Sequence, residues 1–313
     1  GGFGLNTNVM VTTIGTQVAD SYGSDADKSG KVDTKSILAN ANNAIGSQNN
    51  NLTSGSNLIS SDAGVTVSNN SGVSAKTGVT TPAAGTQTLV DNSTITTSDA
   101  LTISADRQTD ATLTAAAATV AGVSGANVTV ATLDAKKDAG VTISGKSVLS
   151  SAKDLTVQAK QHGTTAVKAY QAALSGGLSV NAAFAQSKSS GATNVTLSDS
   201  SLLGGVGGAI NEETGEAYGA TILAEDTGKT TSDVVGLTVS LGAAGGALIT
   251  NAENDSSTKV TINQASTIAS TGATSVTANK ANGISASTLG GALGAGALQG
   301  IVAYAEDKGN SAI

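Results

Sequence analysis

Short segments in which apolar and polar residues alternate recur along the chain. Val141-Thr142-Ile143 and Leu155-Thr156-Val157 are two examples, and residues 127–133 form a longer one. Because successive side chains of a strand point to opposite faces, this alternation predicts short strands with one buried face. Clusters of Ser, Asp, Thr and Gly, such as 198–201 and 270–272, separate the segments as turns.

The segments form a repeat of about 54 residues. The motif at Val141 returns at Val195, 54 residues later, and at Val260, after a further 65 residues. The longer gap predicts a loop insertion at 204–219, where a glycine run leads into an acidic stretch. Self-similarity at a fixed period is typical of stacked repeat units that bury one another's apolar edges.

Two further markers keep the same order along the chain. The second has apolar residues in alternation and occurs at 101–103, 155–157, 221–223 and 275–277. The third is a glycine step leading to an asparagine, and it reaches Asn6, Asn127, Asn181 and Asn251. We therefore expect an all-β fold, with residues 1–313 forming one continuous β-solenoid. A 54-residue unit predicts two or three coils of about 20 to 25 residues each, and hence a rod about 60 to 75 Å long.

Residues 21–60 depart from the repeat. Apolar residues at 37, 38, 41, 44 and 45 have near-helical spacing, so we expect a short helix over 35–45, in a helical and loop insertion near residues 25–50. Residues 68–92, which contain the only proline, Pro82, are expected to be rich in loops.

The composition restricts the core to small side chains. Aromatic residues make up 2% of the chain, hydrophobic residues 39%, and there are 39 glycines. Val, Ile, Ala and Thr can fill a narrow stack of strands, but they fill a wide globular interior poorly. A charged fraction of 12% argues against disorder of the whole chain. The uncharged stretch 281–305 is dominated by Gly, Ala and Ser, so no membrane insertion is expected.

Charge and cysteine content exclude several classes of function. A net charge of −7 and no basic stripe argue against nucleic acid as a partner. The absence of cysteine excludes a disulfide framework, a thiolate metal site and a cysteine nucleophile. The chain begins inside a patterned stretch without a signal peptide, so we expect it to be a segment of a longer, exported protein.

Four consecutive elements carry a resemblance to a known family. They are 155–159 (Leu-Thr-Val-Gln-Ala), an Ala/Gly-rich stretch at 166–177, 178–182 (Leu-Ser-Val-Asn-Ala) and 194–201 (Asn-Val-Thr-Leu-Ser-Asp-Ser-Ser). Over residues 95–313 the chain resembles the large type V secreted, filamentous-haemagglutinin-like adhesins, most closely the leukotoxin-type adhesins of anaerobic Gram-negative bacteria. This resemblance implies a right-handed parallel β-helix on the bacterial cell surface, with roles in adhesion and biofilm formation. The family's secretion domain has no counterpart in the sequence.

The sequence predicts no enzyme. His162 is the only histidine and Arg107 the only arginine, so neither a catalytic triad nor a zinc site can form around them. The adjacent acid pairs at 212–213, 225–226 and 306–307 would point to opposite faces of a strand and would not share a cleft. The glycine runs at 204–208 and 290–296 lack the lysine of a phosphate-binding loop.

One segment has the spacing of a calcium loop. Oxygen ligands occur at positions 1, 3, 5 and 9, a glycine occupies position 6, and Lys31 would contribute its backbone carbonyl. The candidate ligands are Asp25, Asp27, Ser29, Lys31 and Asp33. Ser36 stands where a bidentate acid belongs, so the alternative is a solvated Asp/Ser/Gly turn. No other cofactor is expected.

Three functions are compatible with these features. The first is an adhesive stalk of a secreted surface filament, located extracellularly on a Gram-negative cell. Its partners would be neighbouring repeats or identical subunits, together with host or bacterial receptors or glycans bound through many weak contacts. The second is a self-assembling extracellular filament subunit. The third is a carbohydrate-active enzyme, which would need convergent carboxylates in a cleft.

Overall fold

The computed structural model describes residues 2–14, 85–263 and 265–313. Every regular element in these ranges is a β-strand and none is a helix, which confirms the all-β prediction for this part of the chain. The helix expected at 35–45 and the insertion expected at 21–60 lie outside the described residues.

The strands form four sheets in which all pairs are parallel. The front sheet contains β1 (Phe3–Ile14), β2 (Gly85–Asp91), β6 (Ser124–Lys136), β7 (Asp138–Ser144), β11 (Leu178–Leu197), β15 (Ala243–Ile262), β19 (Gly296–Asp307) and β20 (Ser311–Ala312). The end sheet contains β3 (Thr94–Thr97), β8 (Ser147–Ser151), β12 (Ser200–Gly204) and β16 (Thr267–Ser270). The first rear sheet contains β4 (Leu101–Gln108), β9 (Leu155–His162), β13 (Ala220–Asp226) and β17 (Thr274–Lys280). The second rear sheet contains β5 (Ala111–Ala121), β10 (Thr164–Ser175), β14 (Lys229–Ser240) and β18 (Gly283–Leu293).

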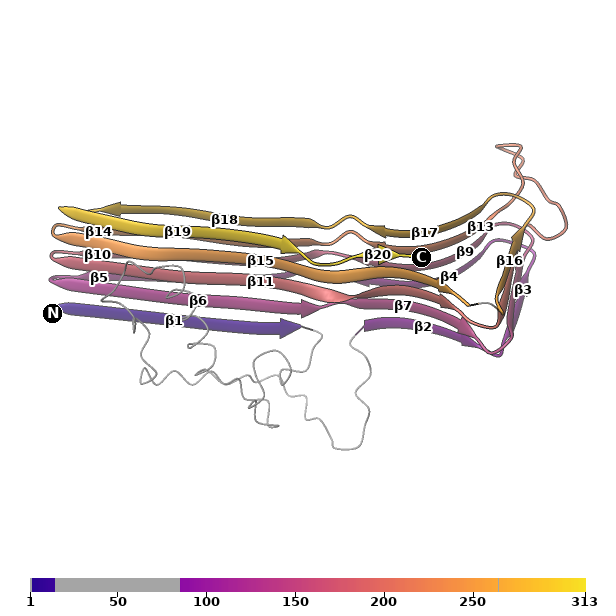
Figure 1. The fold of residues 1–313 in the computed structure, drawn as a ribbon, viewed down its shortest axis with the longest axis horizontal. Coiled ribbons are helices and arrows are strands. Elements are labelled where there is room, and N and C mark those ends of the chain that lie inside the picture. Colours follow the sequence, from indigo (N-terminus) through magenta and orange to yellow (C-terminus); the bar gives the residue numbers. More distant parts are fainter. Residues whose placement is uncertain (1, 15–84, 264) are drawn as a thin grey trace, which may run out of the picture.

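One repeat passes once through all four sheets. The chain runs along the front as β6 and β7, continues through β8, β9 and β10, and returns to the front as β11 (Figure 1). Val141 pairs with Val195 and Val195 with Val260, so the pairing offsets of 54 and 65 residues equal the spacings of the sequence marker. The expectation of two or three coils per repeat is therefore wrong.

The shape of the molecule follows from this wide circuit. A strand of 20 residues, such as β11, extends for about 66 Å, whereas five stacked front strands rise only about 19 Å. The longest axis in Figure 1 accordingly follows the strands. The expected rod of about 60 to 75 Å along the stacking direction is wrong, because each circuit uses more than twice the predicted number of residues.

Two segments interrupt the repeat. Residues 205–219 join β12 to β13 as a loop in which four glycines have positive φ, including Gly207 at 98°, and an isolated bridge pairs Ile210 with Ala217. On the front sheet β1 ends beside Ala135, and β2 begins beside Asp138. Residues 15–84 therefore have no equivalent in the next circuit, where β6 and β7 follow each other almost directly.

The structure corrects two sequence-based alignments and one expected loop region. Ile222 pairs with Val157, whereas the marker at 221–223 would place Leu223 there. Gly246, and not Asn251, pairs with Asn181. Residues 68–92 were expected to be rich in loops, but 85–91 form β2; residues 68–84 lie outside the described part of the chain.

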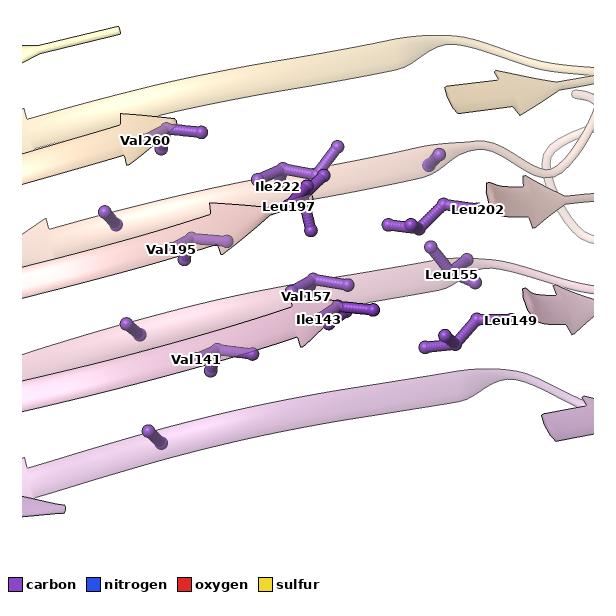
Figure 2. Close-up of a cluster of buried hydrophobic side chains, with 14 residues drawn as sticks. Val141, Ile143, Leu149, Leu155, Val157, Val195, Leu197, Leu202, Ile222 and Val260 are labelled. Carbon is purple, nitrogen blue, oxygen red and sulfur yellow. The ribbon is translucent and has the colours of Figure 1, made fainter. Parts of the chain in front are cut away.

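The largest apolar core lies where the front, end and first rear sheets meet. Val141 of β7, Leu149 of β8 and Val157 of β9 all have 1% exposure or less and point toward one another (Figure 2). Equivalent residues of the next circuit, such as Val195 and Leu202, continue the same columns. A second core, rich in alanine, fills the narrower space between the front and second rear sheets.

Candidate functional surface

The second rear sheet exposes apolar side chains on its outward face. The inward residues Ala115, Ala169 and Val234 are 0 to 1% exposed, whereas the outward residues Val120 and Leu289 are 78% and 66% exposed. We define the apolar face as the outward small and apolar residues of these four strands. They are Ala116, Ala118, Val120, Tyr170, Ala172, Leu174, Val235, Leu237, Val239, Leu289, Gly291 and Leu293.

Strand register arranges the apolar face in three rows that cross all four strands. In the order β5, β10, β14, β18, the rows are Ala116–Tyr170–Val235–Leu289, Ala118–Ala172–Leu237–Gly291 and Val120–Leu174–Val239–Leu293. Each position on one face of a sheet occupies about 33 Å², so the twelve positions cover about 400 Å². An exposed apolar patch of this size commonly marks an interaction site.

The apolar face is hollowed over β5 and β10. The hollow has a volume of about 450 Å³, and Ala116, Ala118 and Ala172 line it beside Tyr170 and Val235. Its cause is the change in side-chain size along the rows, since alanines on β5 and β10 lie next to larger residues on the other strands. The hollow is open to solvent and is lined mainly by small apolar side chains.

A charged pair borders the apolar face. Lys168 of β10 and Asp233 of β14 are register partners in the row that precedes Tyr170 and Val235, and both point outward. Thr114 of β5 and Ser287 of β18 complete this row. The four positions add a polar edge to an otherwise apolar surface.

The sequence contained a signal for this surface that the alternation analysis missed. Strand β14 has apolar residues on both of its faces. Val234 points inward, whereas Val235, Leu237 and Val239 point outward. A strand with one solvated face would carry polar residues at the outward positions. Apolar residues on both faces of one strand are therefore the sequence signal for this surface.

A polar layer separates the two apolar cores inside the molecule. Lys137, between β6 and β7, is fully buried, and Asp226 and Gln161 are 1% and 2% exposed. Asp226 accepts hydrogen bonds from Asn282 Nδ2 at 2.9 Å and from the backbone amide of Gly228 at 3.2 Å. Among the described residues, Lys137 Nζ has no hydrogen-bond partner. Burial lowers the pKa of Lys137, although Asp226 and Asp110 partly offset this effect.

The outward face of the front sheet carries an apolar cluster that includes Val128, Val130 and Ile249, and charged residues lie farther along the same face. Lys188, Glu253 and Glu306 are successive register partners, and Lys308 Nζ lies 3.1 Å from Glu253 Oε1 and 3.0 Å from Glu306 Oε2. Hydrogen bonds from Lys308 and Tyr304 lower the pKa of Glu306. Lys308 thus neutralises two stacked carboxylates, of which Glu253 is the more buried.

The residues considered for catalysis do not converge. His162 Nδ1 lies 3.3 Å from Asp106 Oδ1, and both side chains are about half exposed. Arg107 donates from Nε to Thr109 Oγ1 at 3.2 Å. Glu225 and Asp226 point to opposite faces of β13, since Asp226 is buried and Glu225 is only partly so. In the described ranges, no three His, Cys, Asp or Glu side chains gather to hold a metal ion.

The candidate calcium ligands Asp25, Asp27, Ser29, Lys31 and Asp33 lie outside the described residues, and calcium binding there stays a prediction. The part of the chain that the structure describes contains no helix long and apolar enough to cross a membrane. Comparison with known protein families, with curated proteins and with solved structures finds no match for this chain.

Proposed function

We propose that the four sheets are the walls of a right-handed β-solenoid and that the chain is a structural, adhesive stalk segment of a secreted bacterial surface filament. The observation that carries the proposal is the parallel pairing of each circuit with the next, with the same inward residues stacked on one another. A further circuit can be added without a new type of contact, because each strand already pairs with its equivalent.

Each circuit of the stalk adds a wide exposed surface but only a small increase in length. One circuit of about 54 residues adds about 4.8 Å along the stack, so a projection of about 100 Å would need about twenty circuits. Each circuit offers a wall about 66 Å wide on which side chains repeat at the spacing of the strands. Weak contacts with host or bacterial receptors or glycans would then be strengthened by multivalency.

A second candidate is a self-assembling extracellular filament subunit. The observation that favours it is the pair of open edges, formed at one end of the stack by β1 to β5 and at the other by β16 to β20. Unpaired strand edges can add strands from another chain. Identical subunits would then join end to end.

Electron microscopy of the purified chain separates these functions. The stalk predicts discrete particles about 66 Å long, whereas the filament predicts fibres that grow along the stacking direction. The variant Ile301→Lys places a charge on the inward face of β19, where a further circuit would cover it. If fibres form and this substitution prevents them, the filament is supported and the isolated stalk segment is contradicted.

Location is tested in the parent organism. An antibody against the loop at 205–219 should label intact cells, and external protease should remove the label. An antigen that becomes accessible only after lysis would contradict a surface filament.

A further inference from the structure

We propose that the apolar face is a binding surface for a second copy of this chain, with the second rear sheets of the two copies packed face to face. The pair is related by a two-fold axis that runs parallel to the strands, between β10 and β14. This operation reverses the strand order and keeps the rows level, so β5 of one copy faces β18 of its partner, and β10 faces β14.

Side-chain size supports this arrangement. Along the first row, Ala116 on β5 would face the partner's Leu289, and Tyr170 would face the partner's Val235. In the second row, Leu237 would enter the hollow above the partner's Ala172. Two alanines thus meet leucines, which favours close packing between the sheets at these positions. In the third row, Val120 and Leu174 would pack against the partner's Leu293 and Val239 as apolar pairs.

Charge supports the same axis. Lys168 on β10 would face the partner's Asp233 on β14, and the symmetry repeats this contact on the other side of the axis. A two-fold axis perpendicular to the strands would instead lay β10 antiparallel on the partner's β10. Lys168 would then no longer face the partner's Asp233. Opposite charges at matched positions fix register as well as affinity.

The area is sufficient for a weak dimer. The apolar face and its charged row together occupy sixteen positions, or about 530 Å² of flat sheet for each copy. Two copies bury about 1,000 Å² or more, near the lower limit for a specific interface. We therefore expect a reversible dimer with a dissociation constant in the micromolar range, which further circuits of a longer stack would strengthen.

Sedimentation equilibrium of the 313-residue chain tests the proposal. We expect the mean mass to rise from monomer to dimer as the concentration increases, and Leu237→Lys to weaken the dimer at least about tenfold. The matched control is Leu298→Lys, which changes an exposed leucine, 64% accessible, on the front sheet and should leave the dimer intact. A monomeric mass up to about 1 mM would overturn the proposal.

Charge exchange tests the register. Lys168→Asp and Asp233→Lys should each weaken self-association, because like charges then face each other across the axis. A mixture of the two variants should form a heterodimer more readily than either forms a homodimer, since each substituted residue then meets an opposite charge. A mixture that associates no better than the separate variants would contradict the two-fold axis.

Cross-linking tests which strands face each other, and the chain is suited to it because it contains no cysteine. Ala116→Cys and Leu289→Cys, mixed and treated with a short bis-maleimide, should cross-link faster than either variant alone. Position 116 of one copy would lie directly opposite position 289 of its partner, between backbones about 10 Å apart, whereas identical positions would in addition be offset sideways by three strand spacings, about 14 Å. Faster cross-linking within each single variant would show β5 on β5 and β18 on β18, and would reject the proposed packing. The variant Ile301→Lys should dimerise normally, which separates this contact from end-to-end stacking.

Discussion

Asn127 of β6 donates a hydrogen bond from Nδ2 to the carbonyl oxygen of Ala117 on β5, and the two atoms lie 2.9 Å apart. The same amide lies 3.3 Å from the carbonyl oxygen of Ala172. Asn127 stacks in register between Asn6 and Asn181, and both of these side chains also donate to carbonyl oxygens of the second rear sheet. Asn127 and Asn181 are fully buried and Asn6 is partly buried, and all three tie the front sheet to the second rear sheet at matched heights.

Replacement of Asn127 by alanine should lower the free energy of unfolding by about 1 to 3 kcal/mol, because two carbonyl groups lose a buried donor. Urea unfolding measures this change. The control is Asn194→Ala, since Asn194 lies on the outward face of β11 and its replacement should cost no more than about 0.5 kcal/mol. Equal losses in the two variants would contradict a stabilising role for the buried amide.

Adjacent residues of β13 provide a second test. Ile222 is fully buried between Val157 and Val276, whereas Leu223 points to the other face and is only partly buried. Ile222→Ala should therefore cost about 2 to 5 kcal/mol, and Leu223→Ala less than about 1 kcal/mol.

The comparison is made by urea unfolding of both variants at the same pH. Because a shift of one residue exchanges the two faces of a strand, the register from the sequence marker, which aligned Leu223 with Val157, predicts the reverse order. A larger loss for Leu223→Ala would show that the strand has that register.

The sequence identified the repeat and its offsets but not the size of the circuit. The spacing from Val141 to Val195 was visible because pairing stacks like residues on one another. The length of a circuit depends on where the corners occur, and short turns such as Gly145-Lys146 look the same whether they end a coil or only bend it. Where two adjacent residues are both apolar, as at Ile222 and Leu223, the alternation does not show which of them points inward. The apolar face was missed for the same reason, because the alternation does not show which of Val234 and Val235 points inward.

Gly191 is required where β11 passes the break between β6 and β7. Its φ is +138°, and a Cβ atom there would lie 1.7 Å from the carbonyl oxygen of Lys137. Gly191→Ala should lower the free energy of unfolding by at least about 2 kcal/mol, because it adds backbone strain to a contact that only a backbone shift can relieve.

Gly296→Ala is the matched control, since nothing lies within 4 Å of the added methyl group at the start of β19. That variant should change stability by no more than about 0.5 kcal/mol. Thermal and urea unfolding of the two glycine variants would show whether the effect belongs to position 191. A neutral Gly191→Ala would mean that the neighbouring strands separate freely at this point.

The buried Lys137 should make stability depend on pH in the alkaline range. Burial lowers its pKa in the folded chain below the value of about 10.4 expected when the chain is unfolded. Between these two values the unfolded state binds more protons, so the free energy of unfolding rises as the pH increases. Lys137→Met should abolish this rise, while Lys146→Met, which alters an exposed lysine in the turn between β7 and β8, should retain it.

Urea unfolding from pH 7 to pH 11 gives the slope of the unfolding free energy against pH for each protein. Tyrosine ionisation contributes equally to the slopes of the unsubstituted chain and of both variants. The difference in slope between the two variants therefore comes from Lys137. Parallel pH profiles would mean that the Lys137 amine keeps its charge inside the fold, held by Asp226 and by water in the polar layer.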